Sequence, residues 1–106
     1  MRKITEKAVR AFIEGRNFKR DNTTVQKVFG LFSTEFLLFG NMIALYSRKQ
    51  KTLYVTTAYH PTVTTKERLN GILDAFGLPR IYQKDYVWYF TDGIRFNKPR
   101  TFKLKD

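Results

Sequence analysis

Hydrophobic residues recur three and four positions apart in two stretches of the chain, and each stretch predicts a helix. The first lies between Ala8 and Ile13 and predicts a helix over residues 5–14. We expect Thr5 to cap its start, because a threonine hydroxyl accepts amide hydrogens that the first turn leaves free. We expect Gly15 to end it, because glycine readily adopts the left-handed conformation found after helices.

A second helix is predicted after a capping-box sequence. Thr64 and Glu67 stand three residues apart, so Thr64 is expected to cap the helix while Glu67 reaches back to it. Four apolar residues follow at helical spacing and are expected to be buried against a sheet: Leu69, Ile72, Leu73 and Phe76. Lys66 and Asp74 are expected to face solvent, and Gly77 is expected to end the helix.

Between and after the helices, β-branched and aromatic residues predict short strands. The predicted strands span residues 24–28, 36–39, 42–46, 52–57, 81–83, 86–91 and 94–96. Gly40-Asn41 and Asp92-Gly93 are expected to form two-residue hairpin turns, the latter of type I′. The polar segments 16–22 and 97–106 are expected to be a connector and a tail. The pattern predicts an α+β fold, a mostly antiparallel β-sheet of about six strands with one or two packed α-helices.

Length and composition fit one domain with a core. The chain has 106 residues, 42% of them hydrophobic, including 10 Phe, 6 Tyr and 1 Trp. We expect a single α+β domain over residues 1–97, followed by a basic C-terminal tail over residues 98–106. The longest apolar run, Phe36 to Phe39, is too short to cross a bilayer, and no apolar segment follows the basic N-terminus. We expect an intracellular, soluble protein without a membrane partner.

Signals for catalysis and metal binding are sparse. The absence of cysteine excludes disulfides, cysteine-ligated metals and thiol catalysis. His60, the one histidine, stands in a Tyr-His-Pro turn without an acidic neighbour in sequence, which favours a structural role. No nucleotide-binding or hydrolase motif is present, and the carboxylates form no DxD or ExxE pair. We expect no enzyme, cofactor or metal site; a metal-dependent nuclease assembled from distant residues is the alternative left open.

Positive charge is concentrated at both ends of the chain and in one loop. The chain carries 20 Lys+Arg against 9 Asp+Glu, a net charge of +11. Residues 1–20 hold a surplus of five positive charges, residues 48–51 three and residues 95–106 four, while the rest sums to minus one. This distribution is typical of a protein that meets a polyanion. The candidate phosphate-contacting residues are Arg2, Lys3, Arg16, Lys19, Arg20, Arg48, Lys49, Lys51, Arg68, Lys98 and Arg100.

One predicted strand carries large side chains on both faces. Tyr86, Trp88 and Phe90 alternate there with Val87 and Tyr89. If one face fills the core and the other is exposed beside basic side chains, its rings can stack on unpaired bases. Tyr86 and Trp88 are therefore candidate stacking residues. The alternative is that a small domain buries most of these rings in its core.

Five short motifs follow one another from Asn22 onward. They are Asn22-Thr23-Thr24-Val25, Leu38-Phe39-Gly40-Asn41-Met42-Ile43-Ala44, Thr64-Thr65-Lys66-Glu67-Arg68-Leu69-Asn70-Gly71, Ile81-Tyr82-Gln83-Lys84 and Val87-Trp88-Tyr89. In order and spacing they resemble a family of short proteins found in tailed-phage genomes. The resemblance implies a phage origin and a compact α+β domain, and it implies no activity. Arg68 and Asn70 stand out, because neither serves the predicted cap or the apolar stripe.

Charge and resemblance together predict a small basic phage protein that binds nucleic acid, DNA or RNA, through non-specific phosphate contacts. The aromatic candidates extend this expectation to single strands. No helix carries a row of Arg, Asn and Gln that would read base edges. The alternative is a phage interaction protein that modulates a host or viral protein complex, or a minor virion component, whose charge pairs with an acidic surface. We expect the protein in the cytoplasm of a phage-infected bacterium.

Overall fold

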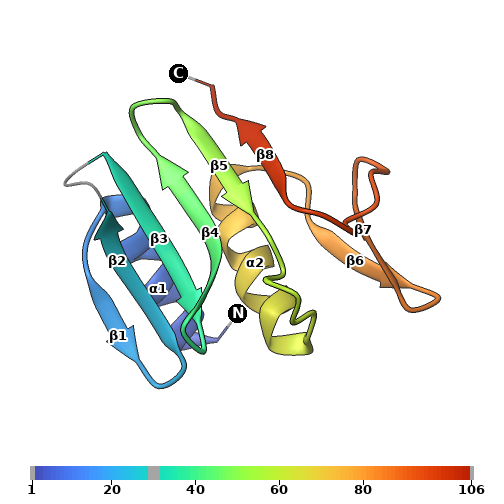
Figure 1. Cartoon of the computed structure of the whole chain (residues 1–106), viewed down its shortest axis with the longest axis horizontal. Coiled ribbons are helices and arrows are strands. Elements are labelled where there is room, and N and C mark those ends of the chain that lie inside the picture. The colour runs from blue at the N-terminus through green and yellow to red at the C-terminus, as the bar shows by residue number, and fades with distance from the viewer. Residues whose placement is uncertain (1, 29–31, 106) are drawn as a thin grey trace.

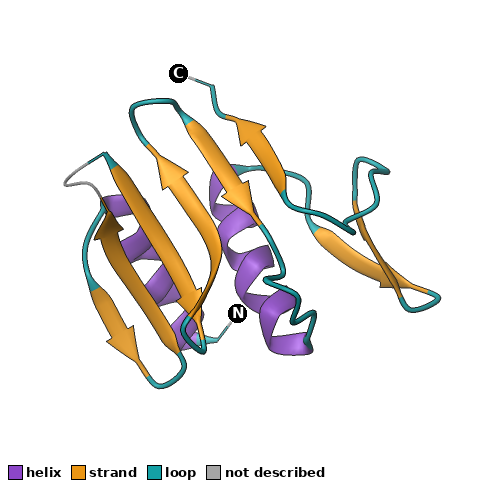
Figure 2. Ribbon diagram, viewed as in Figure 1, coloured by secondary structure: helices purple, strands orange, loops and turns teal. Residues whose placement is uncertain are grey.

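The computed structural model describes residues 2–28 and 32–105, and within them the chain forms the predicted α+β fold (Figures 1 and 2). In chain order the elements are α1 (Lys3–Glu14), β1 (Phe18–Arg20), β2 (Thr23–Val28), β3 (Ser33–Leu38), β4 (Asn41–Ser47), β5 (Thr52–Val55), α2 (Val63–Phe76), β6 (Ile81–Lys84), β7 (Val87–Phe90) and β8 (Arg100–Lys103). Six strands form one antiparallel sheet in the order β1-β2-β3-β4-β5-β8, and β6 and β7 form a separate hairpin. Both helices lie on one face of the larger sheet (Figure 2).

The core lies between this sheet and the two helices. Buried residues alternate with half-buried ones along β3 and β5, so that Phe36 and Leu53 are completely buried on the helix side. Phe12 of α1 packs edge-on against Phe36, with ring centroids 5.7 Å apart. Burying a side chain of this size contributes about 1.5–3 kcal/mol. The hydrophobic effect on this one face therefore holds both helices against the sheet.

Helix α1 begins two residues earlier than predicted, and Thr5 is not its cap. The N-cap is Arg2, which makes no side-chain capping hydrogen bond. Thr5 lies on the buried face of the helix, where its hydroxyl donates to Glu67 Oε1 at 2.7 Å. The Thr5 hydroxyl thus makes a tertiary contact and does not cap α1, although its place in the sequence predicts a cap. Gly15 ends the helix in the left-handed conformation, as predicted, with φ 72°.

Helix α2 is capped by Thr62, two residues before the predicted cap Thr64. Thr62 Oγ1 accepts a hydrogen bond from the Thr65 amide at 3.1 Å. Glu67 does not reach back to the helix start; its carboxylate accepts from Thr5 and Arg68 instead. The capping-box prediction is therefore wrong in register, because a second threonine stands one half-turn earlier in extended backbone.

The two faces of α2 mostly follow the prediction. Three residues of the apolar stripe are completely buried: Leu69, Ile72 and Leu73. Phe76 is only half-buried and packs against the edge of the core. Asp74 is exposed as predicted, whereas Lys66 is half-buried, with its amine 5.9 Å from the centre of the Trp88 ring.

We expect Thr62→Ala to lower the free energy of unfolding by about 0.5–2 kcal/mol, the usual effect of removing an N-cap hydroxyl. Thr64→Ala is the matched control, since Thr64 is half-buried and makes no capping bond, so we expect a smaller loss than in Thr62→Ala. Chemical denaturation of the two variants beside the wild type measures both values. A larger loss of stability in Thr64→Ala than in Thr62→Ala would show that Thr62 is not the N-cap.

Two segments that sequence assigned to loops are the edge strands of the large sheet. Phe18–Arg20, in the expected connector, form β1 and pair with β2. Arg100–Lys103, in the expected tail, form β8 and pair with β5, so that Phe102 is buried opposite Leu53. Edge strands are commonly short and rich in Lys, which protects them from pairing with other chains. Because both segments are short and rich in charged residues, their sequence pattern predicted polar loops instead of strands.

The turn between β3 and β4 is shifted by one residue from the prediction. It consists of Phe39 and Gly40, with φ 52° and 80°, while Asn41 already pairs with Leu38. Two successive positive φ angles are the mark of the type I′ turn, which matches the twist of the strands that it joins. Glycine therefore occupies the second turn position rather than the first.

The turn at Asp92-Gly93 exists but is not of type I′, since only Gly93 has a positive φ, at 93°. The Gly93 amide donates to Phe90 O at 2.9 Å, and the Phe90 amide donates to Ile94 O at 2.8 Å. The loop thus contains three residues and ends with a left-handed glycine, a common alternative hairpin geometry. The predicted strand 94–96 is reduced to a single bridge between Tyr89 and Arg95.

Candidate nucleic-acid interface

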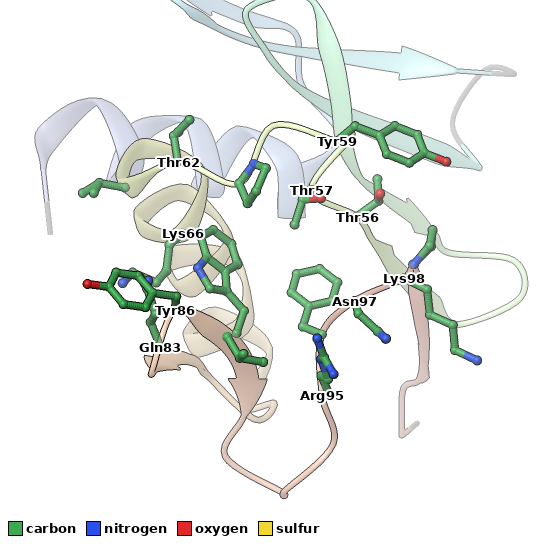
Figure 3. A pocket seen from close by; sticks show the side chains of 16 residues that line it. Thr56, Thr57, Tyr59, Thr62, Lys66, Gln83, Tyr86, Arg95, Asn97 and Lys98 are labelled. Carbon is green, nitrogen blue, oxygen red and sulfur yellow. The ribbon is translucent and has the colours of Figure 1, made fainter.

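A cavity of about 580 Å³ opens where the β6–β7 hairpin meets the start of α2 (Figure 3). Its lining comes from the loop between β5 and α2, the first turn of α2, the hairpin, and residues 95–99. We call this cavity the hairpin groove. Its volume lies in the range of ordinary small-ligand sites, about 300–1,000 Å³, which admits a nucleotide.

Side-chain contacts hold the hairpin in place beside α2. Asn70 of α2 donates to Ile81 O at 2.9 Å and accepts from the Ile81 amide at 2.7 Å, so it fixes the start of β6. At the same open end of the hairpin, where Ile81 pairs with Phe90, Arg100 of β8 binds Asp92 through both oxygens, at 3.2 and 2.6 Å. The hydrogen bonds from Arg100 lower the pKa of the Asp92 carboxyl. The open end of the hairpin is therefore anchored to both α2 and β8.

Exposed aromatic side chains stand at the rim of the hairpin groove. Tyr86 is 94% exposed and Tyr59 is 96% exposed. Both adopt left-handed backbone, with φ 66° and 65°, although this conformation costs a non-glycine residue about 1–3 kcal/mol. In Figure 3 the Tyr59 ring points outward from the loop between β5 and α2. For Tyr86 the angle is explained by the two-residue turn of the β6–β7 hairpin, in which Asp85 also has a positive φ. The exposure of both rings leaves them available for contacts at the rim.

Three cations accompany these rings. Lys66 lies on the first turn of α2, with its amine 5.9 Å from the centre of the half-buried Trp88 ring. Arg95 and Lys98 are exposed on the opposite wall (Figure 3). Among the described residues that line the groove, none is acidic. The α2 N-terminus adds a partial positive charge at Thr62, so the groove favours an anion.

The family model described as Kyanoviridae Gp96 protein matches residues 1–104. The chain belongs to this family of phage proteins. Neither a curated protein nor a solved structure matches the chain.

Within residues 2–28 and 32–105 no helix is long and apolar enough to span a bilayer. In the same part of this Gp96 family member, no three His, Asp or Glu side chains gather as they would around a metal ion.

The groove of this Gp96 family member unites three of the residues selected from sequence: Tyr86, Trp88 and Lys98. Tyr86 is not in the strand where it was expected, because Asp85 and Tyr86 form the turn between β6 and β7. The prediction that Tyr86 and Trp88 share a strand face is therefore wrong. The turn moves Tyr86 to the rim, while Trp88 forms part of the wall.

Sequence reasoning missed Lys66 and Arg95 as groove residues. Lys66 belonged to the expected solvent face of a helix, and Arg95 to an expected strand. Their common signal is weak: each stands within a few residues of a predicted turn or cap. Only the packing of the hairpin against α2 brings them to one cavity.

Arg68 is a framework residue of the Gp96 family member and not a phosphate contact. Its side chain is completely buried, at 1% exposure. It donates to Thr23 at 3.2 Å and to Thr5 at 3.0 Å, and it forms an ion pair with Glu67. Burial alone would raise the pKa of Glu67, but hydrogen bonds from Thr5 and Arg68 outweigh it and lower the pKa. The network ties α1, α2 and β2 together.

Two further candidate cations are committed to the fold. Arg48 donates to Ile13 O at 2.5 Å and to Thr34 Oγ1 at 2.9 Å, which places its guanidinium at the C-terminus of α1. Arg100 holds Asp92 and lies 4.3 Å from the centre of the Phe102 ring. Both contribute charge to the surface, but part of the five guanidinium donors of each is occupied by protein atoms, in three hydrogen bonds of Arg48 and two of Arg100 within the described residues.

The other candidates are distributed over the surface rather than gathered at the groove. The exposed ones are Arg2, Lys3, Arg16, Lys19, Arg20, Lys49 and Lys51. Arg16 pairs with Glu14 at 2.7 Å, and Lys49 lies 5.9 Å from the Phe32 ring centre. The basic N-terminal segment therefore does not converge on the hairpin groove in this Gp96 family member.

Proposed function

We propose that this phage protein binds single-stranded nucleic acid non-specifically, with a segment of the strand seated in the hairpin groove. One observation carries the proposal: the exposed ring of Tyr86, the half-buried ring of Trp88 and three cations line the same cavity, and none of its described lining residues is acidic. This combination of a stacking surface with a positive groove is how proteins hold single strands. A binding role in the cytoplasm of an infected cell suits a member of a phage family.

The aromatic residues favour an unpaired strand over a duplex. Trp88 and Tyr86 can offer ring faces only to bases that are not stacked inside a helix. Each such stacking contact contributes about 1–3 kcal/mol and accepts any base. Lys66, Arg95 and Lys98 supply phosphate contacts, which position a strand without reading its sequence.

Trp88 makes the proposal directly measurable. It is the chain's single tryptophan, so its fluorescence reports on the groove alone. We expect oligothymidylate to quench this fluorescence and to raise the anisotropy of a labelled strand. With three phosphate contacts the log–log salt slope is expected near about −2, at about −0.7 per contact on single strands.

The expected effect of Lys66→Ala/Arg95→Ala is a salt slope less negative by about 1.4, because two phosphate contacts are lost. Lys7→Ala/Arg10→Ala is the matched control, since it removes one lysine and one arginine from the exposed side of α1. The control should keep the wild-type slope. Equal losses in the two double variants would show that binding depends on net charge and not on the groove.

Polyglutamate as a competitor separates stacking from simple charge attraction. It offers negative charge without bases, so it should displace the labelled strand only weakly. If the wild type binds no DNA or RNA at ~50 mM salt, where phosphate contacts are strong, the groove does not hold nucleic acid. The host-protein alternative would then lead, since exposed Tyr59 and Tyr86 also suit a protein contact.

A further inference from the structure

A second basic cavity lies at the opposite end of β8 from the hairpin groove. Its volume is about 630 Å³, and we call it the C-terminal cleft. The turn between β4 and β5, the end of α2 and residues 103–105 line it. Four of its lining residues are cationic, namely Arg48, Lys51, Lys103 and Lys105, and none of those described is acidic.

The strand register creates this cleft from two basic segments that are far apart in sequence. Thr52 pairs with Lys103, and the Leu104 amide donates to Lys51 O at 2.8 Å. The β4–β5 turn and the last residues of the chain are thereby locked side by side. Two of the three basic segments recognised in the sequence thus meet at one place.

Charges in the cleft favour an anion despite the nearby end of α2. A helix C-terminus carries about half a negative charge, but the Gly77 and Leu78 amides bond two carbonyls of its last turn, Leu73 O and Asp74 O. Arg48 is fixed at α1 by hydrogen bonds to the Phe12 and Ile13 carbonyls, so it adds charge to the cleft from a set position. Lys103 and Lys105 are exposed on flexible side chains, so they can approach a phosphate.

We propose that the C-terminal cleft is a second phosphate site for the same strand, so that a bound single strand runs along β8 from groove to cleft. This inference rests on the proposed function of the hairpin groove. Lys98 and Lys103 are five residues apart, at most about 17 Å at 3.3–3.4 Å per residue. That distance is covered by at most about five nucleotides, the number at the 3.4 Å rise of fully stacked bases, and by fewer where bases are unstacked onto the rings. Strands shorter than this reach one site, and longer strands reach both.

Length dependence tests the inference on the wild-type protein. Oligothymidylates of about 3 and about 12 nucleotides bracket the calculated span. Both should quench Trp88, but the longer one should show a salt slope steeper by about 1.4, at about −0.7 for each of two added phosphate contacts. Equal slopes for the two lengths would overturn the second site while leaving the groove proposal standing.

Charge reversal at the cleft gives an independent readout. We expect Lys103→Glu/Lys105→Glu to lose about tenfold or more in affinity for the longer strand at low salt, with the shorter strand bound almost as by the wild type. The control Lys7→Glu/Lys27→Glu makes the same charge change at exposed sites outside both cavities. An unchanged slope in the cleft variant overturns the inference. Failure of the wild type to bind either strand overturns the groove proposal itself.

Discussion

Replacing Arg68 by alanine is expected to lower the free energy of unfolding by about 3–5 kcal/mol, the range for breaking a buried ion pair by removing one partner. Arg68 is the largest completely buried side chain of the described residues. Its loss would leave Glu67 without its cation while Glu67 Oε2 already lacks a hydrogen-bond partner. Thr5 and Thr23 would each lose a donor as well. Chemical denaturation measures the change.

Arg80→Ala is the matched control for this variant. Arg80 pairs with Asp74 at 2.8 Å, but both side chains are largely in solvent. An exposed pair of this kind contributes about 0–1 kcal/mol. If the two variants lost the same stability, burial would not be the reason for the effect.

Acid unfolding adds a readout that a simple packing defect would not change. The pKa of Glu67 is lowered in the fold, so its stabilising contribution is present above the ordinary glutamate pKa of about 4.3 and is lost as pH falls below it. In Arg68→Ala one cause of the lowered pKa is gone. The acid-dependent part of the stability should therefore shrink in the variant.

The Arg68 network gives a structural role to residues of two sequence motifs for which the local sequence suggests none. Asn22, Thr23, Glu67 and Arg68 stand in two motifs that are more than 40 residues apart. Arg68 Nη2 lies 3.4 Å from Asn22 Oδ1, a contact that exists only after β2 and α2 pack on α1. Local patterns reveal a polar residue that no helix face explains. They do not reveal the partner that a long-range contact supplies.

The predicted elements succeeded where short-range periodicity determines structure. The stripe Leu69, Ile72 and Leu73 is buried because helical spacing places these residues on one face. The prediction failed at β8, whose single core residue, Phe102, is surrounded by charged and polar neighbours. An edge strand needs only one buried position, so its sequence carries almost no alternation to detect.

The kind of residues at the candidate site could be predicted from the sequence, but the position of the site in the fold could not. Aromatic residues beside basic ones suggested stacking, and Tyr86, Trp88 and Lys98 do share one cavity. The other contributors come from the start of α2 and from the segment after the Gly93 turn. Their convergence depends on Asn70 and Arg100 holding the hairpin, and neither contact has a sequence signature.

Arg48→Glu is expected to destabilise the fold by about 3 kcal/mol, although it belongs to the most basic loop of the chain. Hydrogen bonds to a charged donor contribute about 1.5–3 kcal/mol each, and Arg48 makes them to Ile13 O and Thr34 Oγ1. A carboxylate there would face the negative end of α1 instead of neutralising it. The Gly15 position reinforces the argument, since a Cβ there would come within 3.0 Å of the Arg48 guanidinium.

Lys49→Glu makes the same charge reversal at the next residue, and we expect it to change stability by less than about 0.5 kcal/mol because the side chain is exposed. Thermal and chemical unfolding of the pair separates structure from surface charge. This separation matters for every binding experiment on the loop, because a loss of binding in Arg48→Glu would report unfolding. Equal melting temperatures for the two variants would show that Arg48 does not hold the end of α1. The loop could then be tested as a simple charge patch, with Lys49 and Arg48 treated alike.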